Sequence, residues 1–103
     1  MDIATLDLNL PLHLVIHGRV QGVGFREGMV TAAIGLEARG WVRNRLDGTV
    51  EAIVQGTPAA RAALVRWAHR GPLGARVERV DVRAAAVDAA LGLPRAFERR
   101  PTA

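Results

Sequence analysis

The hydrophobic positions near the start of the chain change from a period of two to a helical period. In the stretch 12–18, Leu12, Leu14 and Ile16 alternate with the residues of a second face, which is typical of a strand with one apolar face. We expect Gly40 to end the helical segment that follows, because glycine commonly stands just after a helix. Apolar residues recur at helical spacing in that segment (Phe25, Met29, Ala32, Ala33 and Leu36).

The stretch 40–56 predicts a β-hairpin. Asp47-Gly48 favours a two-residue turn, because a type I′ turn needs positive φ at both central positions. The turn would join strands over 41–46 and 49–55. This register pairs Leu46 with Thr49, Asn44 with Glu51, and Val42 with Ile53.

The stretch 57–72 predicts the second helix. Thr57 can cap its N-terminus, Pro58 suits its first turn, and Gly71-Pro72 ends it. After it, 76–84 predicts a strand with Val80 and Val82 on one face. Val77 is out of phase with them, so it either precedes the strand or marks a bulge.

The predicted order is strand, helix, strand, strand, helix, strand. This order is the βαββαβ arrangement of ferredoxin-like α+β domains, with one antiparallel sheet and two helices on one face. We interpret 1–11 as a flexible leader and 12–103 as a single domain. Within it, 84–94 predicts a loop and 95–100 a short extra C-terminal edge strand.

Composition narrows the classes of function. The 103-residue chain has no cysteine, which excludes disulfides, thiolate metal sites and a cysteine nucleophile. It has no apolar run long enough to span a membrane, and its acidic first residues do not resemble a signal peptide, so we expect a cytoplasmic protein. The net charge of +4 is compatible with nucleic acid, an anionic surface or a phosphate ligand, although the arginines are scattered.

A glycine-rich basic loop, HGRVQGVGFREG (17–28), separates the first strand from the first helix. It fits neither the P-loop nor the dinucleotide-binding pattern, because the required glycine and lysine positions do not match. Backbone N–H groups of such a turn at a helix N-terminus can still bind an anion, and Arg26 can add a guanidinium fork. The alternative is a tight turn with a solvated Arg26.

Asn44 is unusual because asparagine is depleted in strands. In the expected register it shares a sheet face with Val42, Leu46 and Ile53, where its carboxamide needs hydrogen-bond partners. It is either a satisfied structural asparagine near a strand end or a group that orients a water or a substrate oxygen.

These stretches together resemble the acylphosphatase family. The resemblance rests on HGRVQGVGFR (17–26) and GLEARGWVRNRLDGTVEAIVQG (35–56), continues in 71–82, and covers roughly 12–84. It implies a ferredoxin-like fold and hydrolysis of small acyl phosphates to carboxylate and inorganic phosphate, with no cofactor and no metal. It also implies that Arg26 binds the phosphate oxygens and that Asn44 positions the attacking water. The phosphate-binding backbone amides would be those of the loop: Gln21, Gly22, Val23, Gly24 and Phe25.

The partners implied are an acyl phosphate and inorganic phosphate, as product and competitive ligand, and we expect a monomer that binds neither membrane nor nucleic acid. His13 and His17 are proton acceptors by residue type, yet nothing in the loop pattern requires them. One alternative is a non-enzymatic anion- or effector-binding module of the same fold. An RNA-binding module would need exposed aromatics, and the chain has only four. Another alternative is the carbamoyl-phosphate domain of larger maturation enzymes.

Overall fold

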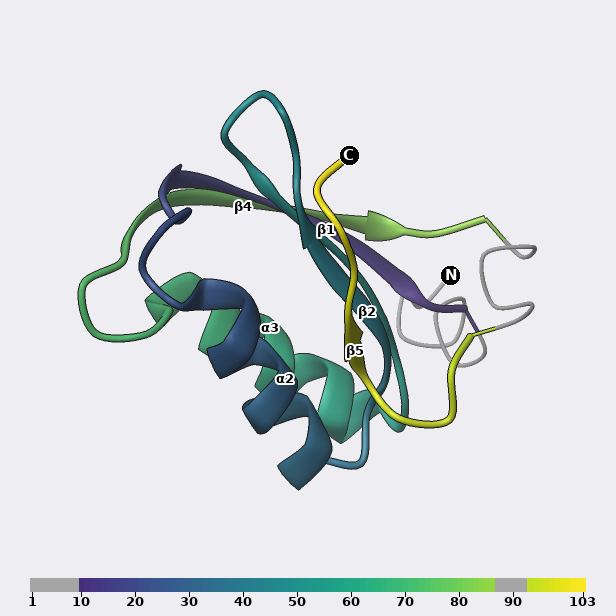
Figure 1. Cartoon of the computed structure of the whole chain (residues 1–103). Coiled ribbons are helices and arrows are strands. Elements are labelled where there is room, and N and C mark those ends of the chain that lie inside the picture. The colour runs from purple at the N-terminus through teal and green to yellow at the C-terminus, as the bar shows by residue number, and fades with distance from the viewer. Residues whose placement is uncertain (1–9, 87–92) are drawn as a thin grey trace.

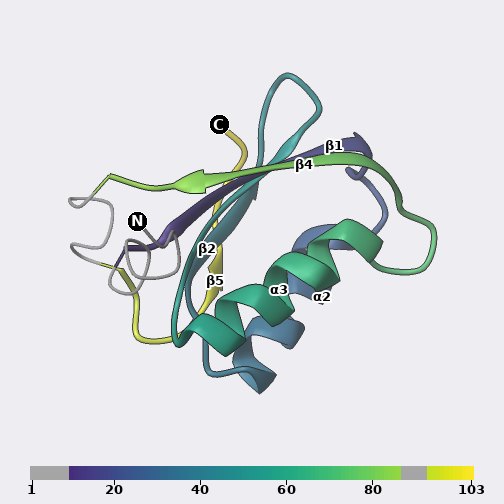
Figure 2. The same cartoon turned by 180° about the vertical axis from the view of Figure 1, so that it is seen from behind.

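The computed structural model describes residues 10–86 and 93–103, and it places two helices on one face of a five-stranded sheet (Figure 1; seen from behind in Figure 2). The strand order across the sheet is β4-β1-β3-β2-β5. The predicted βαββαβ arrangement is therefore confirmed. The elements are β1 (Leu12–Arg19), α2 (Phe25–Gly35), β2 (Arg39–Asn44), β3 (Val50–Gln55), α3 (Pro58–Arg70), β4 (Arg76–Ala84) and β5 (Glu98–Arg99).

The sheet is mixed, which corrects the expectation of a purely antiparallel one. Pairs β1–β3, β1–β4 and β2–β3 are antiparallel, but β5 pairs with β2 in parallel. Because β4 runs opposite to β2, the chain leaves β4 near the end of the sheet where β2 begins. A strand that follows along the free edge of β2 must then run in the same direction as β2.

The main core lies between the helices and the sheet, which the alternation of β1 explains. Leu14 and Ile16 are fully buried against the helices, whereas His13 and His17 lie on the opposite face and are only partly buried. The core residues of the other elements include Met29 and Ala33 of α2, Leu64 and Ala68 of α3, Val42 of β2, Val50, Ala52 and Val54 of β3, and Phe97 before β5.

The hairpin exists, but its turn and register differ from the expectation by one residue. The N–H of Gly48 donates to the carbonyl of Arg45 (3.1 Å) and the N–H of Arg45 donates to the carbonyl of Thr49 (2.9 Å), which encloses a three-residue loop. Only Gly48 of this loop has positive φ (93°), as the common three-residue form requires. The observed pairs are Asn44 with Val50, Arg43 with Glu51, Val42 with Ala52 and Trp41 with Ile53.

The first helix ends earlier than expected, at Gly35 rather than near Gly40. The N–H of Glu37 donates to the Ile34 carbonyl (3.1 Å), and the N–H of Ala38 donates to the Ala33 carbonyl (2.9 Å). This pair of hydrogen bonds is the pattern of a Schellman motif at a helix C-terminus. Glu37 takes the left-handed position of that end, with φ of 58°. Gly40 instead lies inside β2, where a Cβ would come within 1.8 Å of the Ile53 carbonyl oxygen.

The second helix and the last long strand follow the expectations. The Thr57 hydroxyl accepts a bond from the Ala60 N–H (3.1 Å), and the N–H of Gly71 donates to the Trp67 carbonyl (2.7 Å). The register of β1 and β4 shifts between His17 and Gly18, opposite Val77. The out-of-phase valine is therefore part of a β-bulge.

Two expectations fall mostly outside the described residues: the leader over 1–11 and the loop over 84–94. Within the described part of the leader, Pro11 is buried, and the carbonyl of Leu10 accepts a hydrogen bond from Arg61 Nη1 (2.7 Å). Neither helix of the described chain is long and apolar enough to cross a bilayer.

Candidate active site

A cavity of about 140 Å³ opens where the loop 20–24 meets the ends of β2 and β5. It brings together Arg26, at the start of α2, and Asn44, the last residue of β2. These two residues are far apart in the sequence and are the two that the sequence singled out for chemistry. The full lining is Val20, Gly22, Gly24, Phe25, Arg26, Glu27, Asn44 and Arg99.

The loop needs its glycines for backbone conformation rather than for space. Gly22 and Gly24 have φ of 76° and 79°, in the left-handed region, and a Cβ added at either would meet nothing within 4 Å. Gly24 is also the N-cap of α2 and offers no side-chain oxygen to the first helical N–H groups. Since those N–H groups have no partner within a helix, they remain suited to an anion from outside.

The start of α2 is held rigidly beneath this loop. Phe25 is buried and packs edge-on against Trp67 of α3, with ring centroids 5.2 Å apart. A Cβ at Gly28 would lie 2.8 Å from the Trp67 ring, so the two helices approach closely at this point. The backbone that precedes and follows Arg26 is therefore fixed by the core.

Asn44 reaches the cavity because of the register of the hairpin. It lies on the same face of the sheet as Val42 and opposite Val50, both of which are fully buried beneath the helices. The expected neighbour Val42 is confirmed, but Leu46 is exposed in the turn and Ile53 faces the other side of the sheet. The one-residue shift changes the pairing of Asn44 without changing its face.

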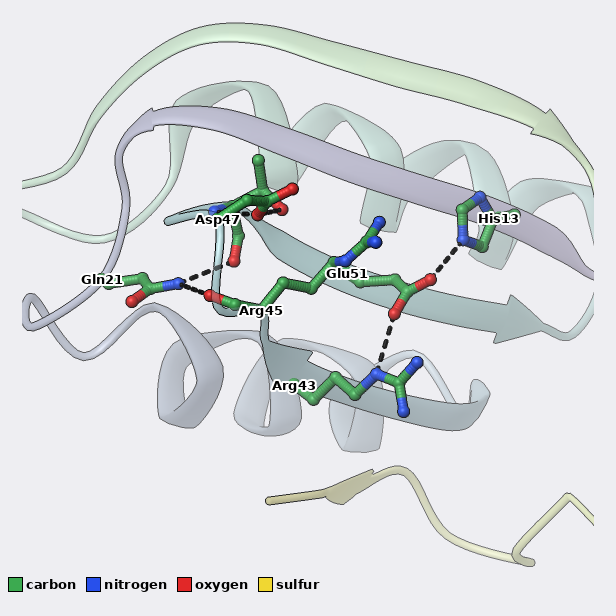
Figure 3. A network of polar contacts seen from close by, with 7 residues as sticks. His13, Gln21, Arg43, Arg45, Asp47 and Glu51 are labelled. Atoms are coloured by element: carbon green, nitrogen blue, oxygen red, sulfur yellow. Dashed lines mark hydrogen bonds and ion pairs between the residues drawn. The ribbon is translucent and has the colours of Figure 1, made fainter. Parts of the chain in front are cut away.

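Two of the predicted loop residues do not line the cavity. Val23 packs against the core. The side-chain amide of Gln21 donates hydrogen bonds to the carbonyls of Arg45 and Thr49, each 2.8 Å long, and so ties the loop to the base of the hairpin (Figure 3). Sequence reasoning considered only the backbone amide of Gln21. The presence of one polar side chain among valines and glycines was the sequence signal that could have indicated this side-chain contact.

The turn that receives Gln21 is stiffened by Asp47. Its carboxylate accepts bonds from the Thr49 N–H (3.0 Å) and the Thr49 hydroxyl (2.6 Å), as in turns closed by aspartate. These hydrogen bonds lower the pKa of Asp47 below its usual value. The hairpin end next to Asn44 is thus held from both sides.

His13 and His17 lie away from the cavity, on the face of the sheet that the helices leave open. His13 Nε2 lies 2.7 Å from Glu51 Oε2, and Arg43 Nε donates to the other oxygen of Glu51 (2.8 Å; Figure 3). Burial raises the pKa of Glu51, but the bonds from His13 and Arg43 outweigh it, so the net shift is downward. His17 similarly pairs with Asp81 at 3.0 Å.

Three cavity residues escaped the sequence reasoning: Val20, which is buried in the core, and the charged residues Glu27 and Arg99. Arg99 of β5 and Glu27 of α2 both line the cavity and form an ion pair between Arg99 Nη1 and Glu27 Oε1. Within residues 10–86 and 93–103, no group of three His, Asp or Glu side chains is arranged to hold a metal ion.

Comparison with known proteins agrees with this geometry. Residues 12–97 match the acylphosphatase family. The chain is 54% identical over 90 residues to an acylphosphatase of Acidovorax sp. (strain JS42), covering 87% of this chain and 89% of the relative. It is 65% identical over 71 residues to one of Thiobacillus denitrificans, covering 69% and 80%. The crystal structure of acylphosphatase from Bacillus subtilis superposes with a TM-score of 0.80 at 31% identity, covering 88% and 98%. The chain therefore belongs to the acylphosphatase family of enzymes.

Proposed function

We propose that the protein hydrolyses the carboxyl–phosphate bond of small acyl phosphates, with the phosphoryl group bound in the cavity between the loop 20–24 and Asn44. The observation that carries this proposal is that Arg26 and Asn44 line one cavity at the N-terminus of α2. A carboxylate is a good leaving group, so the reaction needs positioning and charge stabilisation more than covalent catalysis.

The loop supplies the anion cradle. The backbone amides of Gln21, Gly22, Val23, Gly24 and Phe25 donate to the phosphoryl oxygens. The positive end of the α2 dipole adds to their field. The left-handed conformations of Gly22 and Gly24 support this role, because alternating backbone conformations turn successive N–H groups toward one concavity.

Arg26 supplies the charged wall of the cradle. A guanidinium fork matches two phosphoryl oxygens at once and stabilises the charge that the transition state spreads over them. A cation in the first turn opposes the helix dipole, so without an anionic ligand the position is locally unfavourable. Binding of phosphate explains why an arginine stands there.

Asn44 orients the attacking water. Its amide can donate to the water and accept from it, which fixes the direction of the lone pair for in-line attack on phosphorus. His13 and His17 face the other side of the sheet, so neither takes the proton of the water. In this proposal a phosphoryl oxygen of the substrate takes it. Phosphate and the carboxylate then leave.

Hydrolysis of benzoyl phosphate in the presence of a chelator tests the proposal. We expect turnover by the wild-type protein and its loss in Arg26→Ala and Asn44→Ala, while Arg66→Ala, an arginine of α3 outside the cavity, keeps it. Circular dichroism verifies that the variants are folded. A folded wild-type protein without turnover would favour the non-enzymatic anion-binding alternative.

We further propose that the protein is a cytoplasmic monomer that binds neither nucleic acid nor a membrane. One chain supplies both Arg26 and Asn44 to the cavity, so a monomer is sufficient for the proposed chemistry. Light scattering at the concentrations of the assay checks the oligomeric state.

A further inference from the structure

A carboxylate lies on the wall of a cavity that we propose binds a phosphate dianion. Glu27 occupies the first turn of α2, directly after Arg26, and lines the cavity together with it. The helix dipole stabilises an anion at this end, which suits both Glu27 and a bound phosphate. The Glu27 carboxylate and a bound phosphate would therefore both lie at the positive end of the helix dipole and would repel each other.

Arg99 faces Glu27 from another element of the fold. Its Nη1 pairs with Glu27 Oε1, and it lines the same cavity. The pairing of β5 with β2 sets its place: Arg99 stands opposite Val42, and the N–H of Arg100 donates to the Val42 carbonyl (2.8 Å). The buried ring of Phe97 anchors the chain just before this strand.

The pair does little for stability. The side chains of Arg99 and Glu27 are 52% and 66% exposed, and exposed ion pairs contribute little to folding. The position of this ion pair on the cavity wall is therefore better explained by an effect on ligand binding than by an effect on stability.

We propose that Arg99 is a positioning residue of the phosphate site, which neutralises Glu27 so that the cradle can accept a dianion. This inference rests on the proposed function. It assigns the edge strand β5 a role in substrate affinity, separate from the chemistry at Arg26 and Asn44. It also predicts that the effect of removing Arg99 depends on the presence of the Glu27 charge.

The experiment measures the Kd of inorganic phosphate by calorimetry and the KM and kcat for benzoyl phosphate, at low ionic strength. Arg99→Ala should weaken phosphate binding and raise KM by about fivefold, with kcat unchanged. Glu27→Gln/Arg99→Ala should return both values to those of the wild type, and Arg99→Lys should retain them. In 1 M salt the deficit of Arg99→Ala should shrink, because salt screens exposed charges.

The matched control is Arg100→Ala, which removes the same charge from the residue directly after β5. The Arg100 side chain pairs with Glu98 and stacks over Trp41, and it does not line the cavity, so its loss should leave the Kd of phosphate unchanged. An equal loss in Arg99→Ala and Arg100→Ala would overturn the inference in favour of a general effect of β5 or of net charge.

Three further outcomes would overturn it. Wild-type affinity in Arg99→Ala would show that Glu27 does not need compensation. A double variant as weak as Arg99→Ala would show that Arg99 contacts phosphate itself. A lower kcat in Glu27→Gln would make Glu27 a proton acceptor instead. If the wild-type protein neither binds phosphate nor turns over benzoyl phosphate, the proposed function fails first and the inference falls with it.

Discussion

The side-chain amide nitrogen of Gln21 lies 2.8 Å from the carbonyl oxygen of Arg45, and this contact joins the two halves of the candidate site. Gln21 belongs to the loop that precedes Arg26, and Arg45 directly follows Asn44 in the sequence. The second bond, to the Thr49 carbonyl, fixes the amide across the base of the hairpin. The distance between the loop 20–24 and Asn44 is therefore set partly by the side chain of Gln21.

Replacing Gln21 should loosen this link. In Gln21→Ala both carbonyls keep a backbone donor, from Arg45 and Gly48, so we expect a loss of only about 1 kcal/mol in unfolding free energy. Gln21→Glu should cost about 2 kcal/mol or more, because a carboxylate would face two carbonyl oxygens. In both variants we expect kcat/KM to fall by about tenfold. Urea unfolding and initial rates measure the two effects. Equal stability of the Ala and Glu variants would contradict the donor role of the amide.

Arg26 should not tolerate lysine. A compact ammonium cannot bind two oxygens in a fork, so Arg26→Lys should lose about a hundredfold or more in kcat/KM, as Arg26→Ala does, at a cost of about 3 kcal/mol. The measurement is the steady-state rate at saturating and limiting benzoyl phosphate. Arg66→Lys is the matched control and should behave as the wild type. Near-normal activity in Arg26→Lys would remove the bidentate role.

Asn44 should affect chemistry more than binding. Because we assign it to the water, Asn44→Ala should lower kcat by about a hundredfold while the inhibition constant of inorganic phosphate changes by less than about threefold. Competition assays for phosphate and single-turnover rates separate the two. A collapse of phosphate affinity would place Asn44 in the cradle rather than at the water.

Most residues that line the cavity could be predicted, because they belong to short sequence motifs. In the loop 17–26, the glycines allow the backbone conformation that the turn needs. Asn44 lies two residues after Val42 in the same strand, so the burial of Val42 also determines the face of Asn44. The hairpin register was harder, because Asp47-Gly48 suits both a two-residue and a three-residue loop. The bonds from Thr49 to Asp47, and positive φ at Gly48 alone, decide for the longer loop.

Contacts between distant segments could not be derived from local patterns. The pair of Glu27 and Arg99 depends on the placement of β5 beside β2, and the short run 95–100 carries no signal of its partner strand or its direction. The reach of Gln21 to the hairpin likewise depends on how the loop meets β2 and β3. Periodicity predicts faces of elements, whereas such contacts follow from topology.

Glu37 offers a stabilising substitution at the end of α2. Its φ of 58° is unfavourable for a residue with a Cβ, and glycine is the usual occupant of this position in a Schellman end. Glu37→Gly should therefore raise the unfolding free energy by about 0.5–1 kcal/mol. Glu37→Ala, which keeps the Cβ, should give no such gain. Chemical denaturation of both variants tests this, and a destabilised glycine variant would show that the Glu37 side chain matters more than its backbone.

Glu51 should contribute to the loss of stability in acid. Its pKa in the folded state is below the ordinary value of 4.5, so the carboxylate stabilises the fold above that pH. The contribution is lost as the pH falls from about 4.5 through the folded-state pKa, because the unfolded chain binds the proton more readily. In Glu51→Gln the unfolding free energy should therefore decline less steeply between pH 5 and 3, while Glu78→Gln, at an exposed position of β4, follows the wild type. Urea unfolding across this range is the measurement. An unchanged slope in Glu51→Gln would mean that His13 and Arg43 stabilise the protonated and ionised forms equally.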